Sequence, residues 1–534
     1  MDMSTLDPAV ALELAAVSRQ KPMLEVINLG DSPVQQFYND AVVFVTGGSG
    51  FLGKQLIEKL FRSCKLKKLY LLIRQKGDKS IQERLESMLK DPVFFALNKR
   101  QPRFAERIVP IEGDLAEHNL GISDEAWNSI AKEVNIIFHL AANVKFDESM
   151  KTATHINVNG TMKIIELAKE CKQLKQLIYV STAYSHATEE KIGEEILDDF
   201  YPTPMSPSLI VQMVQTTDEE RLNKITPELM KGWPNTHTFT KAIAEELIRK
   251  AGAELPVCVV RPAMVCPCYY EPRPGWLDMG GIVGLSGIIL GAALGIVHVF
   301  LVNAKTRLAA VPLDYVNNAI IGAAWDSVER KKEGNNDIPV YTVGNEESLV
   351  KWELIGEKLG KECWNSPLAA WYCYLLETKN KLVYLFLTWY LHYIPAYILD
   401  GICILLGKKP QGIGSFVKVY NTIDEKAAAY NYFTTNEFLF RDKNVKGMLK
   451  RMSVNDRAIF NCDLSDIDFA EYTKIWSIGI RKYILRDGLK DSLVSYNRQK
   501  IFRIVNYILV FIYTYAIWFI LHSLFSILKF VLFY

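Results

Sequence analysis

The 534-residue sequence lacks an excess of either charge. Lys and Arg total 62 and Asp and Glu total 60, which leaves a formal net charge of +2. Nothing in that balance points to nucleic acid or to an acidic partner, because such partners favour strongly basic proteins. Residues 1–25 lack the basic start and the apolar run of a secretory signal. Internal repeats and low-complexity segments are absent as well.

A cysteine framework is also missing. Nine cysteines are scattered along the chain, and the only closely spaced pair is Cys266 and Cys268. No second cysteine pair and no histidine pair stands at zinc spacing. We therefore expect no metal site, reduced thiols, and a catalytic part that faces the cytosol.

The sequence does contain apolar strands that alternate with helices. Strands are predicted at 41–45, 68–73, 107–115, 135–142, 176–182 and 256–262, and helices at 54–64, 159–172 and 240–252. This alternation is typical of an α/β protein with a doubly wound parallel sheet. Residues 183–234 interrupt the alternation, and we expect them to form a lid or a substrate insertion.

A glycine-rich turn, TGGSGFLG (46–53), joins the first strand to the first helix. In that context its glycines let the backbone approach a pyrophosphate, which the amino terminus of the helix then binds. The pattern predicts a Rossmann dinucleotide site; the alternative is a purely structural turn. The residues expected to hold the cofactor are Thr46, Gly47, Gly50, Phe51, Leu52 and Gly53.

The end of the second strand indicates which dinucleotide binds. An NAD site would place Asp or Glu there, on the ribose hydroxyl, but this chain has Arg74, with Lys76 close behind. A guanidinium suits a 2′-phosphate, so we expect NADPH; the alternative is a solvated basic turn. Asp114 and Leu115, at the end of the third strand, are expected to border the adenine.

Two further residues are candidates for catalysis. Thr182, with Ser181 as second choice, stands at the carboxyl end of a strand that faces the nicotinamide crevice. Lys241 begins the helix that follows the insertion. A lysine there can hold the cofactor ribose and lower the pKa of a neighbouring proton donor. A lone lysine on a helix is more often a surface charge. Only the glycine turn and the hydroxyl residues upstream support a functional role for Lys241.

Two segments are long and apolar enough to cross a bilayer. Residues 504–528 carry no Asp, Glu, Lys or Arg and follow a basic stretch, which favours a cytosolic amino-terminal side. A buried or interfacial hairpin is the alternative. Residues 279–304 are also free of these charges, but they precede VPLDYVNN (311–318), which looks like soluble sequence. A span there would split the site, so we expect a buried or membrane-skimming wall.

The chain is too long for one ordinary core, so we expect several parts. The predicted organisation is a poorly ordered arm at 1–38, an NADPH-binding Rossmann domain at 39–350, a helical domain at 360–495 and a membrane segment at 503–534.

Taken together, the motifs resemble those of the extended short-chain dehydrogenase/reductases and, more narrowly, of eukaryotic fatty acyl-CoA reductases. The order and spacing cover about residues 40–350, and YLHYIPAYILD (390–400) is similar to that family's carboxyl-terminal domain. The segments that carry the resemblance are TGGSGFLGK (46–54), LLIRQK (71–76), GDL (113–115), FHLAANVKFDE (138–148), NVNGT (157–161), YVSTAYSH (179–186), TFTKAIAEE (238–246), VVRPAMV (259–265), EPRPGW (271–276) and VPLDYV (311–316).

The resemblance implies that two NADPH molecules reduce a long-chain acyl-CoA to a primary alcohol through a bound aldehyde. Thr182 would then polarise the carbonyl oxygen, and 279–304 would line an acyl channel. The sequence departs from the family in two places. His237 stands where the family's Tyr-x-x-x-Lys pattern has tyrosine, and MGGIVGLSG (279–287) replaces a polar Asn-Gly-Pro stretch.

His237 therefore joins Thr182 and Lys241 as a candidate catalytic residue. If the helix begins before His237, His237 and Lys241 share one face, a turn apart. Three roles are open to the histidine: direct proton donation, a water-mediated or steric role, or a sign of lost activity.

Three functions follow from these observations. The first is an active reductase whose partners are long-chain acyl-CoA and membrane lipid. The second is a cofactor-binding scaffold with little turnover, and the third is a membrane dehydrogenase for a sterol or another lipid. Oligomeric state and the choice among endoplasmic reticulum, peroxisome and lipid droplet are left open.

Overall fold

The computed structural model describes residues 6–282, 284–344, 347–353, 355, 366–408 and 414–533. Its centre is a seven-stranded sheet in the order β11-β7-β5-β4-β1-β2-β3, and every neighbouring pair is parallel. The strands are β1 Val42–Thr46, β2 Lys68–Ile73, β3 Ile108–Glu112, β4 Ile136–His139, β5 Gln176–Val180, β7 Val257–Pro262 and β11 Val340–Val343. The predicted doubly wound fold is confirmed, and the sequence missed only the edge strand β11 of this sheet.

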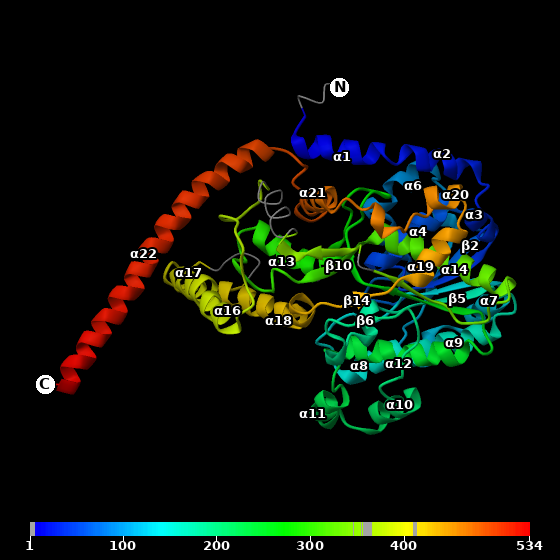
Figure 1. Ribbon diagram of the computed structural model, residues 1–534, viewed down its shortest axis with the longest axis horizontal. Helices are drawn as coiled ribbons and strands as arrows, with labels where there is room; N and C mark the ends of the chain where they lie inside the picture. The colour runs from blue at the N-terminus through cyan, green and yellow to red at the C-terminus, as the bar shows by residue number, and fades with distance from the viewer. Residues whose placement is uncertain are drawn as a thin grey trace.

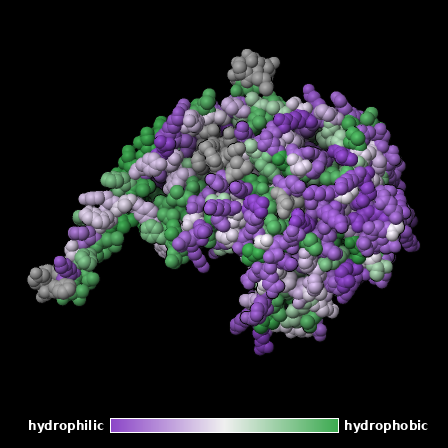
Figure 2. Space-filling view, viewed as in Figure 1, coloured by the Kyte–Doolittle hydropathy of each residue, from purple (hydrophilic) through white to green (hydrophobic). Residues whose placement is uncertain are grey.

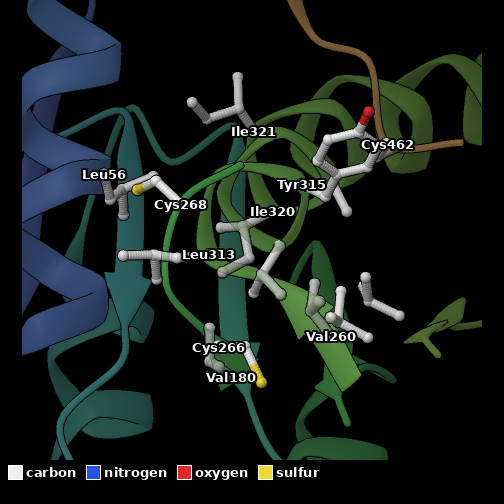
Figure 3. Packing of buried hydrophobic residues seen from close by; sticks show 14 of the residues in the cluster. Leu56, Val180, Val260, Cys266, Cys268, Leu313, Tyr315, Ile320, Ile321 and Cys462 are labelled. Atoms are coloured by element: carbon white, nitrogen blue, oxygen red, sulfur yellow. The ribbon is translucent and has the colours of Figure 1, made fainter. Parts of the chain in front are cut away.

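Helices cover both faces of the sheet because its strands are apolar on both sides (Figure 1). On one face lie α4 Phe51–Ser63 and α14 Leu313–Lys332, whose side chains pack on alternate strand residues (Figure 3). On the other lie α7 Asp124–Glu133, α9 Gly160–Glu170 and α12 Thr236–Ala251. The chain runs outward from β1 to β3 and then resumes at β4, so the strand order reverses between β1 and β4. Doubly wound sheets bind ligands at this reversal.

The amino-terminal residues form helices. Residues 6–38 contain α1 Pro8–Ser18, α2 Lys21–Leu29 and α3 Pro33–Phe37, so the expectation of a poorly ordered arm is wrong for them. Arg19 pairs with Glu471 at 2.5 Å, and the Asp7 carboxylate accepts the Ser492 backbone N–H and hydroxyl. Polar contacts to distant segments of the chain therefore hold this amino-terminal part in place.

The insertion at 183–234 contains η6 Ala183–His186, η7 Glu189–Lys191, β6 Glu195–Ile196, α10 Pro207–Thr216 and α11 Glu219–Leu229. Helices α10 and α11 build a small cluster with α12 and α8 Met150–Thr154. They lie on the far side of α12 from the sheet (Figure 1). The other elements of this half are α5 Ile81–Leu89, η2 Pro92–Phe94, α6 Phe95–Arg100, η3 Phe104–Arg107, η4 His118–Gly121 and the π-helix η5 His155–Asn159.

The apolar segment 279–304 is not one long helix. Its described residues form η8 Met279–Ile282, α13 Leu285–Ala293 and β9 Val299–Leu301, and much of the segment is buried. A nine-residue α13 is far too short to cross a bilayer, so the expectation that this segment does not span is confirmed. Around it lie β8 Met264–Cys266, β10 Arg307–Pro312, β12 Leu349–Lys351 and β13 Leu376–Thr378.

The carboxyl-terminal part is helical, as expected for 360–495, but residues of α19 and α20 share the core of the α/β domain. Of its predicted span, residues 360–365 and 409–413 lie outside the described residues. Its elements are α16 Lys381–Thr388, the π-helix η9 Trp389–Tyr393, α17 Ile394–Leu405, α18 Phe416–Thr435, β14 Leu439–Phe440, α19 Lys443–Arg451, α20 Val454–Ile459, η10 Leu464–Asp466, α21 Phe469–Gly479 and η11 Ile480–Leu485.

The last helix, α22 Ser492–Phe533, extends away from the body (Figure 1). Two helical runs in the described chain are long and apolar enough to cross a membrane, Lys381–Leu405 and Ser492–Lys529. The second contains the predicted segment 504–528; the first was expected only as part of a helical domain. Apolar residues gather along α22 and beside it, while polar residues dominate the opposite side of the molecule (Figure 2).

Candidate active site

The glycine-rich turn lies where the strand order reverses. Gly47 has φ +75°, and a Cβ there would stand 2.6 Å from the Ala141 backbone nitrogen. A Cβ on Gly53 would stand 2.4 Å from the Gly47 carbonyl oxygen, so only glycine lets α4 come this close to the turn. Gly50 begins α4 without a side-chain cap. The first N–H groups of α4, at Phe51 and Leu52, therefore point to the crevice without intrahelical partners.

Thr46 lies beneath this turn and is fully buried. Its hydroxyl accepts the Ala141 N–H at 3.3 Å and donates to His139 Nδ1 at 2.8 Å. His139 Nε2 in turn donates to the Thr161 hydroxyl at 3.1 Å, because that hydroxyl donates to the Asn157 carbonyl. Burial and then the Lys241 charge lower the pKa of His139 to about 3, so its imidazole is neutral. The sequence did not point to this network, which fixes the turn to β4.

The EPRPGW segment and η8 cover the other side of the turn. The Phe51 ring stacks on Trp276 with centroids 5.4 Å apart, and a Cβ on Gly281 would be 3.0 Å from that Phe51 ring. Lys54 Nζ binds Asp91 at 2.8 Å and Asp278 at 2.9 Å. The Leu52 carbonyl accepts the Asn317 amide at 3.0 Å. This motif is therefore a structural cover for the cofactor turn.

Arg74 lies at the carboxyl end of the sheet, beyond β2. Its side chain is 60% exposed, and Nη1 stands 3.5 Å from an Asp114 carboxylate oxygen. Burial and the neighbouring Arg74 charge lower the pKa of Arg84, which places a second guanidinium nearby that the sequence did not single out. Asp114 donates its N–H to the Leu120 carbonyl at 2.8 Å, and Leu115 is buried beside it. Arg74, Asp114 and Leu115 thus meet at one end of the sheet.

Thr182 and Ser181 follow β5 but differ in their partners. Ser181 donates to Glu245 Oε1 at 2.5 Å, so its hydroxyl is used inside the protein. Thr182 caps the start of η6, where its hydroxyl accepts the Tyr184 N–H at a long 3.3 Å. Thr182 is half-buried and is the hydroxyl with the greater freedom to bind a substrate.

His237 and Lys241 share one face of α12. Asn235 caps this helix by accepting the Thr238 N–H at 2.9 Å, so the helix starts at Thr236, before His237. Lys241 Nζ donates to the Val180 carbonyl at 2.6 Å. Burial lowers the pKa of Lys241 to about 7, although Glu245 opposes the shift. Because the helix begins before His237, the two side chains share one face as expected. Lys241 is a buried amine whose pKa lies near neutral pH.

The hydrogen bond of His237 fixes its tautomer. Nδ1 lies 2.7 Å from the Asn143 carbonyl oxygen, which can only accept, so Nδ1 carries the proton. Burial, and then the Lys241 charge, lower the pKa of His237 to about 4. At neutral pH the imidazole is therefore neutral, and its Nε2 offers a lone pair. In this form His237 can accept a hydrogen bond at Nε2 but has no proton there to donate.

Asn143 is itself held by Asn157 of η5. Asn157 Oδ1 accepts the Asn143 N–H at 2.8 Å, and its Nδ2 donates to the Thr240 hydroxyl at 2.9 Å. Thus η5, α12 and the loop that follows β4 are fixed to each other at the site. Single-turn π-helices often mark functional sites, and no pattern in the sequence revealed this one.

A buried ion pair behind Lys241 was also missed. Arg261 binds Glu245 through Nε at 2.9 Å and Nη2 at 2.6 Å, and Ser181, Ser185 and His186 contact the same carboxylate. Burial alone would raise the pKa of Glu245, but Arg261 and His186 hold it well below its usual range. The available signal was Arg261 in an otherwise apolar strand, since a buried charge needs a partner.

Aromatic side chains from distant segments close the outer side of the site. The Phe146 ring lies 6.0 Å from His237, 4.9 Å from Tyr430 and 5.4 Å from Phe433. Tyr184, two residues beyond Thr182, packs on Phe433 at 4.9 Å. Helix α18 of the carboxyl-terminal part therefore forms an apolar wall beside the candidate catalytic residues.

Comparison with known proteins gives the family. Two family profiles, both described as male sterility protein, match residues 45–320, as an NAD-binding domain, and residues 391–487. Fatty acyl-CoA reductase wat of Drosophila melanogaster is 35% identical over 93% of this chain and 94% of its own length. The chain belongs to the fatty acyl-CoA reductase family. Human fatty acyl-CoA reductase 1 is another such relative, 32% identical over 85% of this chain and 87% of its own.

Solved structures support the fold of this fatty acyl-CoA reductase family member. A reductase domain of a non-ribosomal peptide synthetase from Mycobacterium tuberculosis covers 86% of this chain and 95% of its own, with TM-score 0.56 and 18% identity. The terminal R domain of the myxalamid pathway covers 85% and 92%, with TM-score 0.53 and 19% identity. At these identities the likeness concerns the fold alone. The glycine turn and the NAD-binding profile together show a nicotinamide cofactor site.

Proposed function

We propose that the protein reduces a long-chain fatty acyl-CoA to the primary alcohol with two molecules of NADPH. The observation that carries this proposal is the shared face of Lys241 and His237 on α12, with Lys241 bound to the Val180 carbonyl just before Thr182 and His237 bound to the Asn143 carbonyl in the loop after β4. The Gly47 turn packs closely on Ala141 of that same loop. The relatives named fatty acyl-CoA reductase support the substrate class. They argue against a sterol dehydrogenase.

NADPH is the proposed form of the cofactor because the Arg74 guanidinium lies beyond the end of β2, where Arg84 of α5 also feels its charge. Arg74 is largely exposed and holds Asp114 only at 3.5 Å, so it can turn toward a 2′-phosphate. Arg84 adds positive potential beside it.

The proposed mechanism uses the residues around the crevice. Bound NADPH supplies a hydride for each of the two reductions. Thr182 donates a hydrogen bond to the carbonyl oxygen as negative charge develops on it. In the first reduction the hydride adds to the thioester carbonyl to give the hemithioacetal oxyanion. The carbon–oxygen double bond then re-forms, the carbon–sulfur bond breaks, and CoA leaves as its thiolate. In the second the aldehyde oxygen becomes an alkoxide that must gain a proton.

Lys241 is the proposed source of that proton. Its pKa of about 7 makes the ammonium a competent acid at neutral pH, and its bond to Val180 fixes its position. His237 Nε2 accepts a hydrogen bond from a water, which in turn passes the proton to the alkoxide. The histidine thereby occupies the family's tyrosine position as an acceptor that orients water.

Membrane attachment by α22 is the remaining part of the proposal. Among the described residues, the last hydrogen bond of α22 to the body joins Thr514 to Tyr390. Residues 515–533 beyond it would measure about 28 Å as a helix, close to the ~30 Å hydrocarbon core of a bilayer. The basic residues Arg498, Lys500 and Arg503 precede this part and favour a cytosolic reductase.

The experiment that tests the function uses full-length protein purified in detergent. It is incubated with NADPH and acyl-CoA of increasing chain length, and alcohol, aldehyde and free CoA are measured. We expect alcohol from long chains, with a broad optimum because each methylene contributes only about 1–3 kcal/mol of discrimination. NADPH binding without turnover would instead favour the scaffold, which the neutral His237 makes the second candidate.

A further inference from the structure

The helical run Lys381–Leu405, made of α16, η9 and α17, has an apolar outer face. Twelve large apolar residues on the run and just beyond it are exposed: Leu382, Val383, Leu385, Phe386, Trp389, Tyr397, Ile398, Leu399, Ile402, Ile404, Leu405 and Leu406. Residues 382–399 contain no Asp, Glu, Lys or Arg. The opposite face is buried, where His392 Nε2 accepts the His298 backbone N–H at 2.9 Å. A soluble protein rarely leaves an apolar surface of this extent in water.

The inner face of this run is bound to α18, which runs antiparallel to it. Tyr393 donates to one Asp424 oxygen at 2.7 Å and Tyr384 to the other at 3.4 Å. The Asp400 carboxylate accepts the Phe416 and Val417 N–H groups at 2.9 and 3.1 Å, which caps the start of α18. The run and α18 therefore form one hairpin.

Helix α18 is in turn fastened to the reductase body. Tyr420 donates to the Ile296 carbonyl and Tyr432 to the Ala187 carbonyl, each at 3.0 Å. Lys418, Glu425 and Lys426 are exposed along it. If the run crossed a bilayer, α18 would carry these charges to the same depth, which costs several kcal/mol for each. The hairpin can therefore lie on a membrane, but its geometry opposes crossing one.

The run also meets α22 at the place where that helix leaves the body. The Tyr390 and Tyr513 rings are 5.2 Å apart, and Tyr513 donates to the Tyr390 carbonyl at 3.2 Å. In Figure 1 the run lies beside the middle of α22, and in Figure 2 the apolar colouring continues along that helix. The exposed face of the run is thus continuous with the proposed membrane anchor.

We propose that Lys381–Leu405 lies flat in the cytosolic leaflet of a phospholipid bilayer and forms a second membrane contact that does not span. Trp389 and Tyr397 would rest at the headgroup level, where aromatic rings are favoured. Lys381 begins the run, Lys379 and Lys408 flank it, and all three would reach the phosphates. The assignment to the cytosolic leaflet rests on the proposed anchoring by α22. The membrane contact itself rests on the exposed apolar residues of the run.

The test measures the depth of labelled residues in full-length protein reconstituted into phosphatidylcholine–phosphatidylserine vesicles. Cys403, the described cysteine that is not buried, is replaced by serine. A fluorophore is then attached through one of three substitutions: Leu385→Cys on the run, Leu521→Cys on the anchor, or Val454→Cys on α20. Val454 is 82% exposed and serves as the position away from the membrane. Lipids brominated near the headgroup or near the chain end serve as shallow and deep quenchers.

We expect the shallow quencher to be several times more effective than the deep one at position 385, and neither to act at 454. No quenching at 385 would overturn the proposal, and so would stronger quenching by the deep lipid. An N-glycosylation acceptor inserted after Gly407 separates lying from spanning: modification in microsomes would show a span and refute the flat arrangement. Quenching at 521 reports the anchor independently, so failure of α22 to insert is distinguished from failure of the run.

Discussion

At the scale of single residues, the hydrogen bond from His237 to Asn143 determines what the imidazole can do. The Asn143 carbonyl accepts a hydrogen bond from the Nδ1–H group and leaves Nε2 as an acceptor, while burial beside Lys241 keeps the ring uncharged at neutral pH. Proton donation by His237 itself would need the imidazolium, whose pKa of about 4 makes it scarce. The water-mediated role is therefore the one that the contacts favour.

Substitutions at His237 separate these roles. His237→Asn keeps an N–H for Asn143 but lacks Nε2, so we expect alcohol formation to fall by about 10²-fold with the fold intact. His237→Tyr should retain or raise activity, because a phenol restores a donor. Steady-state turnover and thermal unfolding of both variants are the measurements. Full activity of His237→Asn would show that Nε2 has no role in the reaction. If His237→Tyr were active and the unmodified protein were not, the result would support the hypothesis of a cofactor-binding scaffold.

The pH dependence follows from Lys241. Its pKa, lowered to about 7 by burial, means that the ammonium is lost as pH rises through neutrality. If this ammonium supplies the proton, turnover at saturating substrate should decline on the alkaline side with an apparent pKa near 7. Lys241→Arg, which stays charged, should abolish that limb, although its overall rate will be lower. A profile that is flat across neutral pH would contradict the assignment.

Cofactor preference depends on Arg74. Arg74→Asp should weaken NADPH binding by roughly 10- to 100-fold, equivalent to about 1.5–3 kcal/mol for a charge-assisted hydrogen bond, and should narrow the gap to NADH. Arg103→Asp is the control, since Arg103 is 84% exposed and pairs with Glu106. Binding of both nucleotides is measured by fluorescence titration. Equal affinity for NADH and NADPH in the unmodified protein would refute the preference.

Stability at the site depends on the pair of Glu245 and Arg261. Glu245→Gln leaves Arg261 buried without a counter-charge, so the free energy of unfolding should fall by about 3–5 kcal/mol. Glu220→Gln, at an ion pair on the surface, should change it by less than about 1 kcal/mol. Denaturant unfolding in detergent compares the two. Similar losses in both variants would show that the buried pair contributes little.

At the scale of elements, α22 divides into a docked part and a free part. Trp371 donates to Asn506 at 2.8 Å and Tyr513 contacts Tyr390, so removal of 503–534 would also expose part of the body. Removal of 515–534 leaves these contacts intact.

We expect the chain without residues 515–534 to move largely into the carbonate-soluble fraction, because the remaining contact at Lys381–Leu405 is interfacial. Fractionation of membranes followed by immunoblotting measures the shift. If the shortened chain resists carbonate, then α22 is not the principal anchor.

At the scale of the whole molecule, the sequence predicted what local patterns encode. The six strands from 41 to 262 were identified because burial on both faces makes parallel strands continuously apolar. The glycine turn was identified because its glycines stand directly between a strand and a helix. The sequence did not predict the pairing of Glu245 with Arg261 or the packing of Phe433 on Phe146. Each of these contacts joins residues that only the fold brings together. The helices of 6–38 were missed for the same reason, since their partners include Glu471 and Ser492.

The continuity of α22 has a consequence for the whole assembly. From Ser492 to Phe533 the helix contains neither proline nor glycine, the usual sources of a sharp kink. Its docked half is fixed to the body through Gln499 and Asn506. If α22 anchors the protein as proposed, the half beyond Thr514 would not turn independently of the docked half, and its tilt in the bilayer would set the tilt of the reductase. The active-site crevice would then keep a fixed orientation relative to the membrane surface while the protein diffuses laterally in the membrane.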